Sequence, residues 1–353
     1  MKVKHHEQPP GVKEIARRAN VSIATVDRVI HNRPGVSTKT RDNIERIIRE
    51  LNYQPNILAR RLASRSVLKL ISLIPKTSVE TDFWEAPLAG IMQAAEEIRQ
   101  FGVSIEKYFF DLNDKKSFIK QTRLILKQKP DGILLAPSFI KESIAFVHTC
   151  RELNIPYVFI NSDIPQQESL CYIGPDLFHS GYLSAHLMSY CVPENAPILI
   201  LNISREMEDH HHLLRKEEGF RAYFKDKKQS IVKVDLQQTD KSAIARQVAA
   251  TLTTYPHIQA IFVTNSRVSA VAQYLETAKK KDLVLIGYDY IKENISYLQK
   301  GLIDFLICQQ PQKQGYHGIM ALYQSLVLRT PIDKVHFMPI DIITKENYAF
   351  YKN

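Results

Sequence analysis

The chain has 353 residues, a length typical of two or three folded units. Hydrophobic residues make up 44% and charged residues 24%, close to globular averages, which excludes a disordered chain and a membrane channel. The start is polar and no stretch is long and apolar enough to span a bilayer, so we expect a cytoplasmic protein without a secretory signal. The four cysteines lack metal-ligand spacing, so no zinc site or disulfide scaffold is expected: Cys150, Cys171, Cys191 and Cys308.

The positive charge of the chain is concentrated near its N-terminus. Residues 1–66 hold 14 Lys and Arg against 6 Asp and Glu, which gives +8 of the total net charge of +10. Each basic side chain set against a phosphate releases condensed counterions, so a small basic module on a nearly neutral body is typical of a protein that binds a polyanion. A solvated basic tail would lack apolar periodicity, which this segment has.

Three short helices are expected in this basic module. Apolar residues at helical spacing predict a first helix over about residues 12–19, followed by a tight turn at Asn20. Ser22 is a good N-cap for a second helix, which residues 32–35 end, and Ser37 caps a third. The spacing is that of a helix-turn-helix module.

Several segments of this module resemble the DNA-binding headpiece of the lactose-repressor (LacI/GalR) family. The matching segments are VKEIA (12–16), VSIATVDRV (21–29), VS (36–37), LNYQPN (51–56) and ARRL (59–62), and the match runs without a gap over about residues 11–64. The resemblance implies a transcriptional regulator that binds double-stranded DNA and inserts its second helix into the major groove. The implied DNA contacts of this helix and its flanks are Ser22, Ile23, Ala24, Thr25, Arg28 and Asn32.

Arg28 is the strongest candidate for reading a base. By resemblance Ile23, Ala24 and Arg28 hold the base-reading positions. A guanidinium can pair bidentately with guanine O6 and N7, whereas Ile23 and Ala24 offer only apolar contact, for example to a thymine methyl. The alternative for Arg28 is a solvated helix charge that touches only phosphate.

Two residues depart from the family pattern. Asp27 stands where the family usually has Ser, and we expect it to orient a neighbour such as Arg28 or Arg18 rather than to read a cytosine amine. Gly11 stands where Thr usually caps the first helix, so one hydroxyl contact to phosphate is lost while the backbone amides remain.

Residues 55–64 resemble the family's hinge helix. Fewer than about 12 residues rarely hold a helix in water, and the resemblance implies that this one forms when two subunits meet on DNA. Leu62 holds the position of a leucine that enters the minor groove, where an apolar wedge kinks the duplex. The alternative is packing of Leu62 on its own chain. The hinge residues expected at DNA are Ala59, Arg60 and Leu62.

The remaining residues alternate short apolar runs with helical stretches, which predicts parallel sheets covered on both faces. The strands are expected at 70–74, 105–110, 132–136, 157–160, 198–202, 231–234, 260–264 and 284–287. Together with the headpiece this gives an α/β chain: a small all-α helix-turn-helix domain (1–54), a hinge (55–66) and two doubly wound subdomains (67–353). The subdomains resemble the type I periplasmic-binding-protein fold. We expect the first to comprise about 67–171 and 304–334, and the second about 172–303 and 335–353.

A ligand is expected between the two subdomains, because ligands of open α/β sheets lie beyond the carboxyl ends of the strands. Amides, carboxylates and aromatic faces there suit a polyol, whose hydroxyls need paired donors and acceptors and whose ring faces need apolar cover. By resemblance some of these match sugar-binding positions. The candidates are Phe83, Trp84, Asp111, Ser138, Asn161, Arg215, Lys216, Asn265, Tyr288, Asp289 and Gln309.

Some of these assignments stay open. The family usually has Arg where this chain has Lys216, so either Arg215 or Lys216 could clamp the ligand. Phe83 could equally be a core aromatic. The run of three histidines at 210–212 is expected to lead into a helix rather than to bind a metal, since three consecutive side chains cannot converge on one ion, although one could reach the cleft.

The sequence thus predicts a cytoplasmic homodimeric repressor with a small, sugar-like effector and no cofactor. An enzyme lacks support, because there is no G-x-G-x-x-G, P-loop, G-x-S-x-G or metal-spaced His/Glu motif. A transport-binding protein is excluded by the absent signal and the DNA module. A nucleoside effector and corepressor logic remain alternatives.

Overall fold

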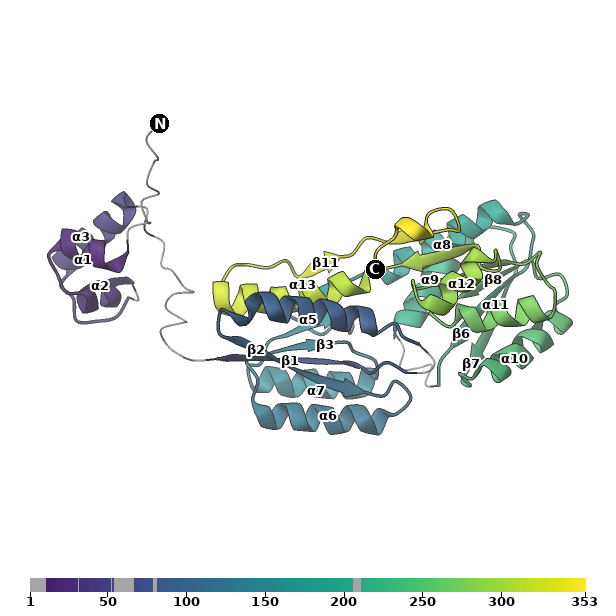
Figure 1. Cartoon of the computed structure of the whole chain (residues 1–353), viewed down its shortest axis with the longest axis horizontal. Helices are drawn as coiled ribbons and strands as arrows, with labels where there is room; N and C mark the ends of the chain where they lie inside the picture. Colours follow the sequence, from purple (N-terminus) through teal and green to yellow (C-terminus); the bar gives the residue numbers. More distant parts are fainter. Residues whose placement is uncertain (1–10, 31, 52, 54–66, 79–80, 206–210) are drawn as a thin grey trace, which may run out of the picture. The chain divides into compact units, whose positions relative to one another are not determined.

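The computed structural model describes residues 11–30, 32–51, 53, 67–78, 81–205 and 211–353. Contacts divide the chain into two units, Met1–Ala63 and Ser64–Asn353 (Figure 1). The predicted hinge contacts Ala59, Arg60 and Leu62 lie outside the described residues.

The first unit contains three helices around one small core. They are α1 (Val12–Ala19), α2 (Ile23–Ile30) and α3 (Thr38–Glu50), which confirms the predicted helix-turn-helix module. Ile15, Val26 and Ile44 are fully buried, one from each helix. Asn20 adopts the predicted left-handed conformation after α1 (φ 51°), and the Ser22 Oγ accepts a hydrogen bond from the Thr25 amide at 3.1 Å. Turn and cap together set the entry of α2.

The second unit contains two six-stranded sheets. The first has the strand order β11-β5-β4-β3-β1-β2 and is parallel throughout. Its strands are β1 (Leu68–Pro75), β2 (Val103–Phe110), β3 (Gly132–Leu135), β4 (Tyr157–Ile160), β5 (Cys171–Gly174) and β11 (Val335–Phe337). Helices α5 (Glu85–Arg99) and α13 (Pro311–Tyr323) cover one face, and α6 (Lys115–Gln128) and α7 (Ile140–Glu152) the other (Figure 1). The π-helical turn η2 (Gln324–Leu328) continues α13.

The second sheet has the order β12-β10-β9-β8-β6-β7, parallel except for its edge strand β12. Its strands are β6 (Ile198–Ile203), β7 (Ile231–Leu236), β8 (Ala260–Val263), β9 (Val284–Tyr288), β10 (Phe305–Cys308) and β12 (Asp341–Ile343). The surrounding helices are α8 (Leu177–Cys191), α9 (His211–Phe224), α10 (Lys241–Thr254), α11 (Val268–Thr277), α12 (Lys292–Gln299) and the 3-10 turn η3 (Tyr348–Phe350). Both faces of β6 are buried, as the continuous apolar run predicts.

The predicted subdomain boundaries are wrong at three places. β5 and β11 pair in the first sheet, and β10 lies in the second, so the chain crosses between the sheets after β5, after β10 and after β11. The sequence gives little warning, because β11 has only three residues, all exposed, and is held at the sheet edge by pairing of Val335 with Tyr172. Helical spacing places Leu88, Ile91, Met92, Ala95 and Ile98 on one apolar stripe of residues 87–101, but Met92 is 53% exposed in α5.

Close helix packing positions the second helix of the second subdomain. A Cβ on Gly181 of α8 would lie 1.8 Å from the Lys216 carbonyl oxygen, and one on Gly219 of α9 would lie 1.9 Å from the Phe178 carbonyl oxygen. Only glycine therefore allows this approach of α8 and α9. The contact holds the backbone of Lys216 against α8.

Candidate functional site

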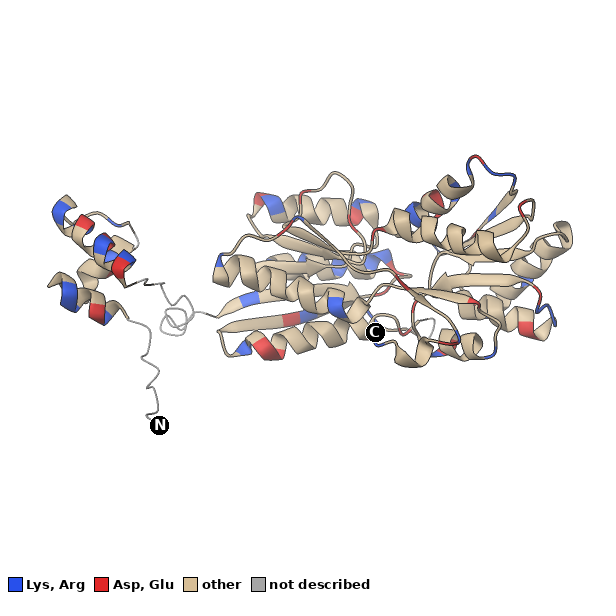
Figure 2. Cartoon of the chain, turned by 90° about the horizontal axis from the view of Figure 1, so that it is seen from above, with Lys and Arg blue, Asp and Glu red and all other residues tan. Residues whose placement is uncertain are grey.

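The exposed face of α2 carries the residues predicted to contact DNA. Ser22, Ile23, Ala24 and Arg28 are exposed, whereas Val26 and Val29 are buried in the core. Ile23 is 50% exposed, so its side chain is accessible to another surface. Basic positions lie on all three helices of this unit (Figure 2).

Hydrogen bonds order the ends of α2. The hydroxyls of Ser22 and Thr25 lie 2.9 Å apart at the start of the helix. At its end Asn32 adopts a left-handed conformation (φ 52°), and its Oδ1 accepts a hydrogen bond from Arg41 at 2.8 Å. Thr25 and Asn32 thus have structural partners within the headpiece, in addition to their predicted role at DNA.

Asp27 makes an ion pair with Arg33, at 3.3 Å between Oδ2 and Nη1. The sequence predicts that Asp27 orients a neighbour, with Arg28 and Arg18 as the candidates. Arg18 instead pairs with Glu14 at 2.9 Å. Both members of the Asp27–Arg33 pair are exposed by about half, so the pair contributes orientation more than stability.

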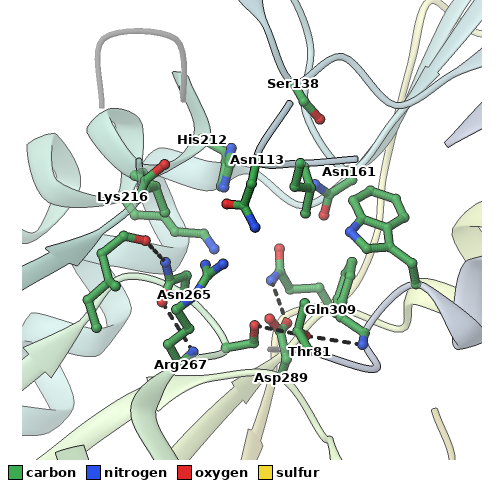
Figure 3. Close-up of a pocket in the computed structure, with 17 residues that line it drawn as sticks. Thr81, Asn113, Ser138, Asn161, His212, Lys216, Asn265, Arg267, Asp289 and Gln309 are labelled. Atoms are coloured by element: carbon green, nitrogen blue, oxygen red, sulfur yellow. Dashed lines mark hydrogen bonds between the residues drawn. The ribbon is translucent and has the colours of Figure 1, made fainter. Parts of the chain in front are cut away.

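In the second unit, a polar cavity lies at the carboxyl ends of strands from both sheets (Figure 3). Its empty volume is about 680 Å³, a figure that includes open solvent at the mouth of the cavity. The lining residues that the sequence predicted are Phe83, Trp84, Ser138, Asn161, Lys216, Asn265, Asp289 and Gln309.

One wall is built on the ends of β9 and β10. Asp289 follows β9 and is 8% exposed; its Oδ1 accepts a hydrogen bond from the Gln309 Nε2 at 3.2 Å. The Gln309 Oε1 is buried and has no hydrogen-bond partner in the described part of the chain. Figure 3 shows it facing the cavity, so it is available to a ligand hydroxyl.

The loops around Asp289 are held rigidly. Asp289 adopts a left-handed backbone conformation (φ 76°), and the Asn294 Nδ2 donates to the carbonyl oxygens of Tyr288 and Asp289 at 2.9 and 3.1 Å. The Asn265 Nδ2 donates to the Ile203 carbonyl oxygen at 2.7 Å. Backbone strain that is held by buried hydrogen bonds is a feature of binding sites.

Lys216 brings a buried ammonium to the cavity. It is 3% exposed, and its Nζ lies 3.3 Å from the Thr264 carbonyl oxygen and 3.6 Å from the centroid of the Tyr288 ring. Burial lowers the pKa of Lys216 to about 8, against the opposing effect of Asp289. Burial also raises the pKa of Asp289 to about 6, which the Lys216 charge and the Gln309 hydrogen bond oppose.

Residues of the first subdomain close the other side. Phe83 and Trp84 are 8% and 5% exposed and pack edge to face, with ring centroids 5.1 Å apart. Asn161 follows β4 and adopts a left-handed conformation (φ 68°). The hydroxyl of Thr81 lies 3.2 Å from that of Ser266, so one hydrogen bond joins the two subdomains beside the cavity.

Three of the predicted ligand residues do not line the cavity. Arg215 pairs with Glu218 on the surface and lies over the Phe178 ring, since adjacent residues of a helix point about 100° apart. The structure therefore places Lys216, not Arg215, at the cavity. Asp111 forms an ion pair with Lys76 at 2.9 Å.

Tyr288 is the third. It is fully buried beneath Lys216, and its hydroxyl lies 3.1 Å from the Ser180 Oγ. The Tyr288 ring packs against the Lys216 ammonium rather than covering a ligand ring.

The structure adds lining residues that the sequence analysis did not predict. Six of these lie one or two positions from a predicted residue: Thr81, Leu112, Asn113, Leu213, Ser266 and Arg267. Ile203 and Ser204 lie at the end of β6, a strand end for which no site residue was predicted. Position at a strand end therefore predicts most of the loops that line the cavity, but not which side chain of each loop points inward. His212 also lines the cavity, so one residue of the histidine run does reach the cleft.

The fold and the two sites define a protein with a helix-turn-helix module and a small-molecule-binding unit of the periplasmic-binding-protein type. In the described residues, no helix has both the length and the apolar character needed to cross a membrane. Comparison with known families matches residues 11–56 to the bacterial regulatory proteins of the lacI family and residues 71–328 to the periplasmic binding protein domain. The chain belongs to the LacI family of bacterial transcription regulators, which are not enzymes, and carries a periplasmic-binding-protein-like effector domain.

Several known proteins are similar to this chain. The ribose operon repressor of Halalkalibacterium halodurans is 26% identical over 79% of this chain and 80% of its own length. The transcriptional regulator RegA of Clostridium acetobutylicum is 28% identical, but over only 45% of either chain. A crystal structure assigned to a LacI transcriptional regulator of Bacteroides fragilis covers 81% of this chain and 100% of its own, with a TM-score of 0.76 and 28% identity.

Proposed function

We propose that this regulator is a cytoplasmic repressor of a carbohydrate-utilisation operon, and that a small sugar-like effector in the cleft changes its affinity for the operator. The observation that carries this proposal is the cavity between the two sheets. It offers a carboxylate and amides from Asp289, Gln309, Asn265 and Asn161 together with the aromatic ring of Trp84. These groups match the hydroxyls and the apolar ring face of a monosaccharide. The similarity to a ribose operon repressor supports a sugar.

The effector acts by differential affinity for two arrangements of the subdomains. The lining residues come from both sheets, so a bound ligand stabilises the closed cleft over the open one. In the proposed dimer, closure changes the spacing of the two hinge segments. This changes the fraction of molecules that can bind DNA. The Thr81–Ser266 hydrogen bond joins the two sides in this structure and favours the closed arrangement.

The DNA-binding form in this proposal is a homodimer on a pseudo-palindromic operator. One headpiece of three short helices contacts too little DNA for specificity, and two-fold symmetry doubles the contacts. Leu62 wedges into the minor groove between the half-sites. Leu62→Ala should then reduce both operator affinity and the bend of the operator, measured by anisotropy and by gel mobility of permuted fragments. An unchanged bend angle would remove Leu62 from the minor groove.

The proposal is tested by selecting an operator from random double-stranded DNA and then titrating it with the full chain. We expect two-fold symmetry in the selected sequences and a dimer in sedimentation of the complex. A panel of pentoses, hexoses, uronates and nucleosides is then added at fixed protein concentration. A change of operator affinity with a sugar supports the proposal, whereas a response to nucleosides alone favours the alternative effector class. Tighter operator binding with the ligand would show corepressor logic.

Effector affinity should depend on pH in a bell-shaped manner. Below about pH 6 Asp289 becomes protonated and loses part of its capacity to accept hydroxyl hydrogen bonds, and above about pH 8 Lys216 loses its charge. Each limb involves one proton, so the affinity should fall by about tenfold per pH unit at most. Calorimetry of the tightest sugar from pH 5 to pH 9 measures the profile. Asp289→Asn should remove the acidic limb and keep the alkaline one; an unaltered acidic limb would assign it to another group.

A further inference from the structure

The described residues that line the cavity carry more positive than negative charge. Lys216 and Arg267 are cationic, Asp289 is the one carboxylate among these residues, and His212 adds an imidazole. A site for a neutral sugar has no need of this excess. The inference below rests on the proposed effector site and names the chemical class of its ligand.

Without a ligand the excess positive charge is energetically unfavourable, because one of the cations, Lys216, is buried. Its ammonium is buried, and in the described part of the chain it donates to a carbonyl oxygen and lies against an aromatic ring, both neutral. A buried charge needs an opposite charge or several hydrogen bonds to offset its lost hydration. Asp289 provides part of this compensation through space, as its effect on the Lys216 pKa shows.

Arg267 adds a second cation from the same subdomain. It follows β8, and its backbone amide donates to the Asn265 Oδ1 at 3.1 Å, which fixes the start of the side chain. Figure 3 shows the guanidinium of Arg267 and the ammonium of Lys216 both pointing into the cavity. Asp289 and Gln309 are joined by a hydrogen bond at the ends of β9 and β10. The cavity therefore has a cationic part beside a part suited to hydroxyls.

We propose that the effector is an acidic monosaccharide, whose anionic group lies against Lys216 and Arg267 while its hydroxyls meet Asp289, Gln309 and Asn161. One negative charge on the ligand balances the excess charge of the described lining residues. A guanidinium and an ammonium are the side chains that recognise carboxylate and phosphate. Uronates and aldonates carry the former group and sugar phosphates the latter.

Calorimetry of the full chain with matched sugars tests this inference. The neutral members are D-glucose, D-galactose and D-mannose, and the acidic members are their uronates, their aldonates and their 6-phosphates. We expect at least one acid to bind about 10- to 100-fold tighter than its neutral parent, the size of one charge-assisted hydrogen bond or more. The carboxylate and phosphate arms identify which anion is preferred.

Variants of the two cations then locate the anion. Arg267→Gln should weaken the acidic sugar by about tenfold more than its neutral parent, which reduces the preference for the acid. Lys216→Met, which keeps the apolar stem of the side chain, should have the same selective effect. Arg215→Gln is the matched control, because Arg215 is the neighbour of Lys216 on α9 but pairs with Glu218 outside the cavity. A melting curve checks that each variant folds.

The outcomes separate this inference from the function on which it rests. Neutral sugars that bind as tightly as their acids, or an acid preference that survives Arg267→Gln and Lys216→Met, would overturn the inference and leave a sugar-responsive repressor. A panel in which no sugar binds would overturn both the inference and the sugar effector. In that case the operator selection still tests the DNA-binding function independently.

Discussion

Replacing Asp289 with Asn is expected to abolish the effect of the effector on operator binding while operator binding without effector stays near that of the parent chain. Asp289 is buried in a wall of the cavity and accepts a hydrogen bond from Gln309, so its carboxylate meets the ligand rather than the DNA. An amide keeps the size of the side chain but accepts fewer hydrogen bonds from ligand hydroxyls. We expect effector affinity to fall by about 10- to 100-fold.

Asn is a better substitution than Ala at this position. The backbone of Asp289 is left-handed (φ 76°), a conformation that Asn adopts more readily than Ala. An Ala variant would add backbone strain to the loss of the carboxylate. Glu276→Gln is a matched control, because Glu276 carries a similar charge but pairs with Lys300 on the surface. It should change neither effector affinity nor the response of DNA binding.

The coupling between the two sites gives a stricter check of the same variant. If the effector changes operator affinity by some factor, the operator must change effector affinity by the same factor. Calorimetry with and without operator, and anisotropy with and without effector, measure the two factors separately. In the Asp289→Asn variant, both of these factors should approach one. Full effector affinity in this variant, or a bound sugar outside the cavity, would contradict the assignment.

The headpiece could be predicted almost completely from the sequence because its signals are local. The left-handed Asn20, the Ser22 and Ser37 caps and the apolar spacing of each helix all act within a few residues. The same holds for the fully apolar, buried strands of the second unit, for example β8. Local signals therefore predict the order of helices and strands along the chain. That order in turn predicts parallel sheets covered by helices.

The wrong predictions concern features that depend on contacts between residues far apart in the sequence. β11 is a short, exposed edge strand whose pairing with β5 joins residues far apart in the sequence, so no local pattern assigns it to the first sheet. Within the cavity, most of the loops were predicted but not every inward side chain: Asn113 lines the cavity instead of Asp111, and Arg267 accompanies the predicted Asn265. Asp111 follows β2 and pairs with Lys76, which follows the neighbouring strand β1. The sequence does not predict the direction of these two side chains.

Replacing Arg28 with Ala is expected to relax operator specificity at one base pair of each half-site. Arg28 lies on the exposed side of α2, opposite the buried Val26 and Val29, and its guanidinium has the fork geometry that pairs with guanine O6 and N7. Loss of such a bidentate contact costs about 1–3 kcal/mol for the preferred base and little for the other bases. Anisotropy with a set of operators, each changed at one base pair, measures this pattern.

A phosphate contact would give a different result from a base contact, which makes the Arg28 prediction decisive. Arg28→Lys keeps the charge but lacks the fork, so it should lose the base preference while retaining most of the salt dependence of binding. Arg49→Ala, which removes an exposed cation from the last turn of α3, is the charge-matched control for Arg28→Ala. It should leave the pattern of base preference intact. If Arg28→Ala instead weakens every operator by the same factor and Arg28→Lys restores binding to all of them, Arg28 contacts the backbone and the base is read by Ile23 or Ala24.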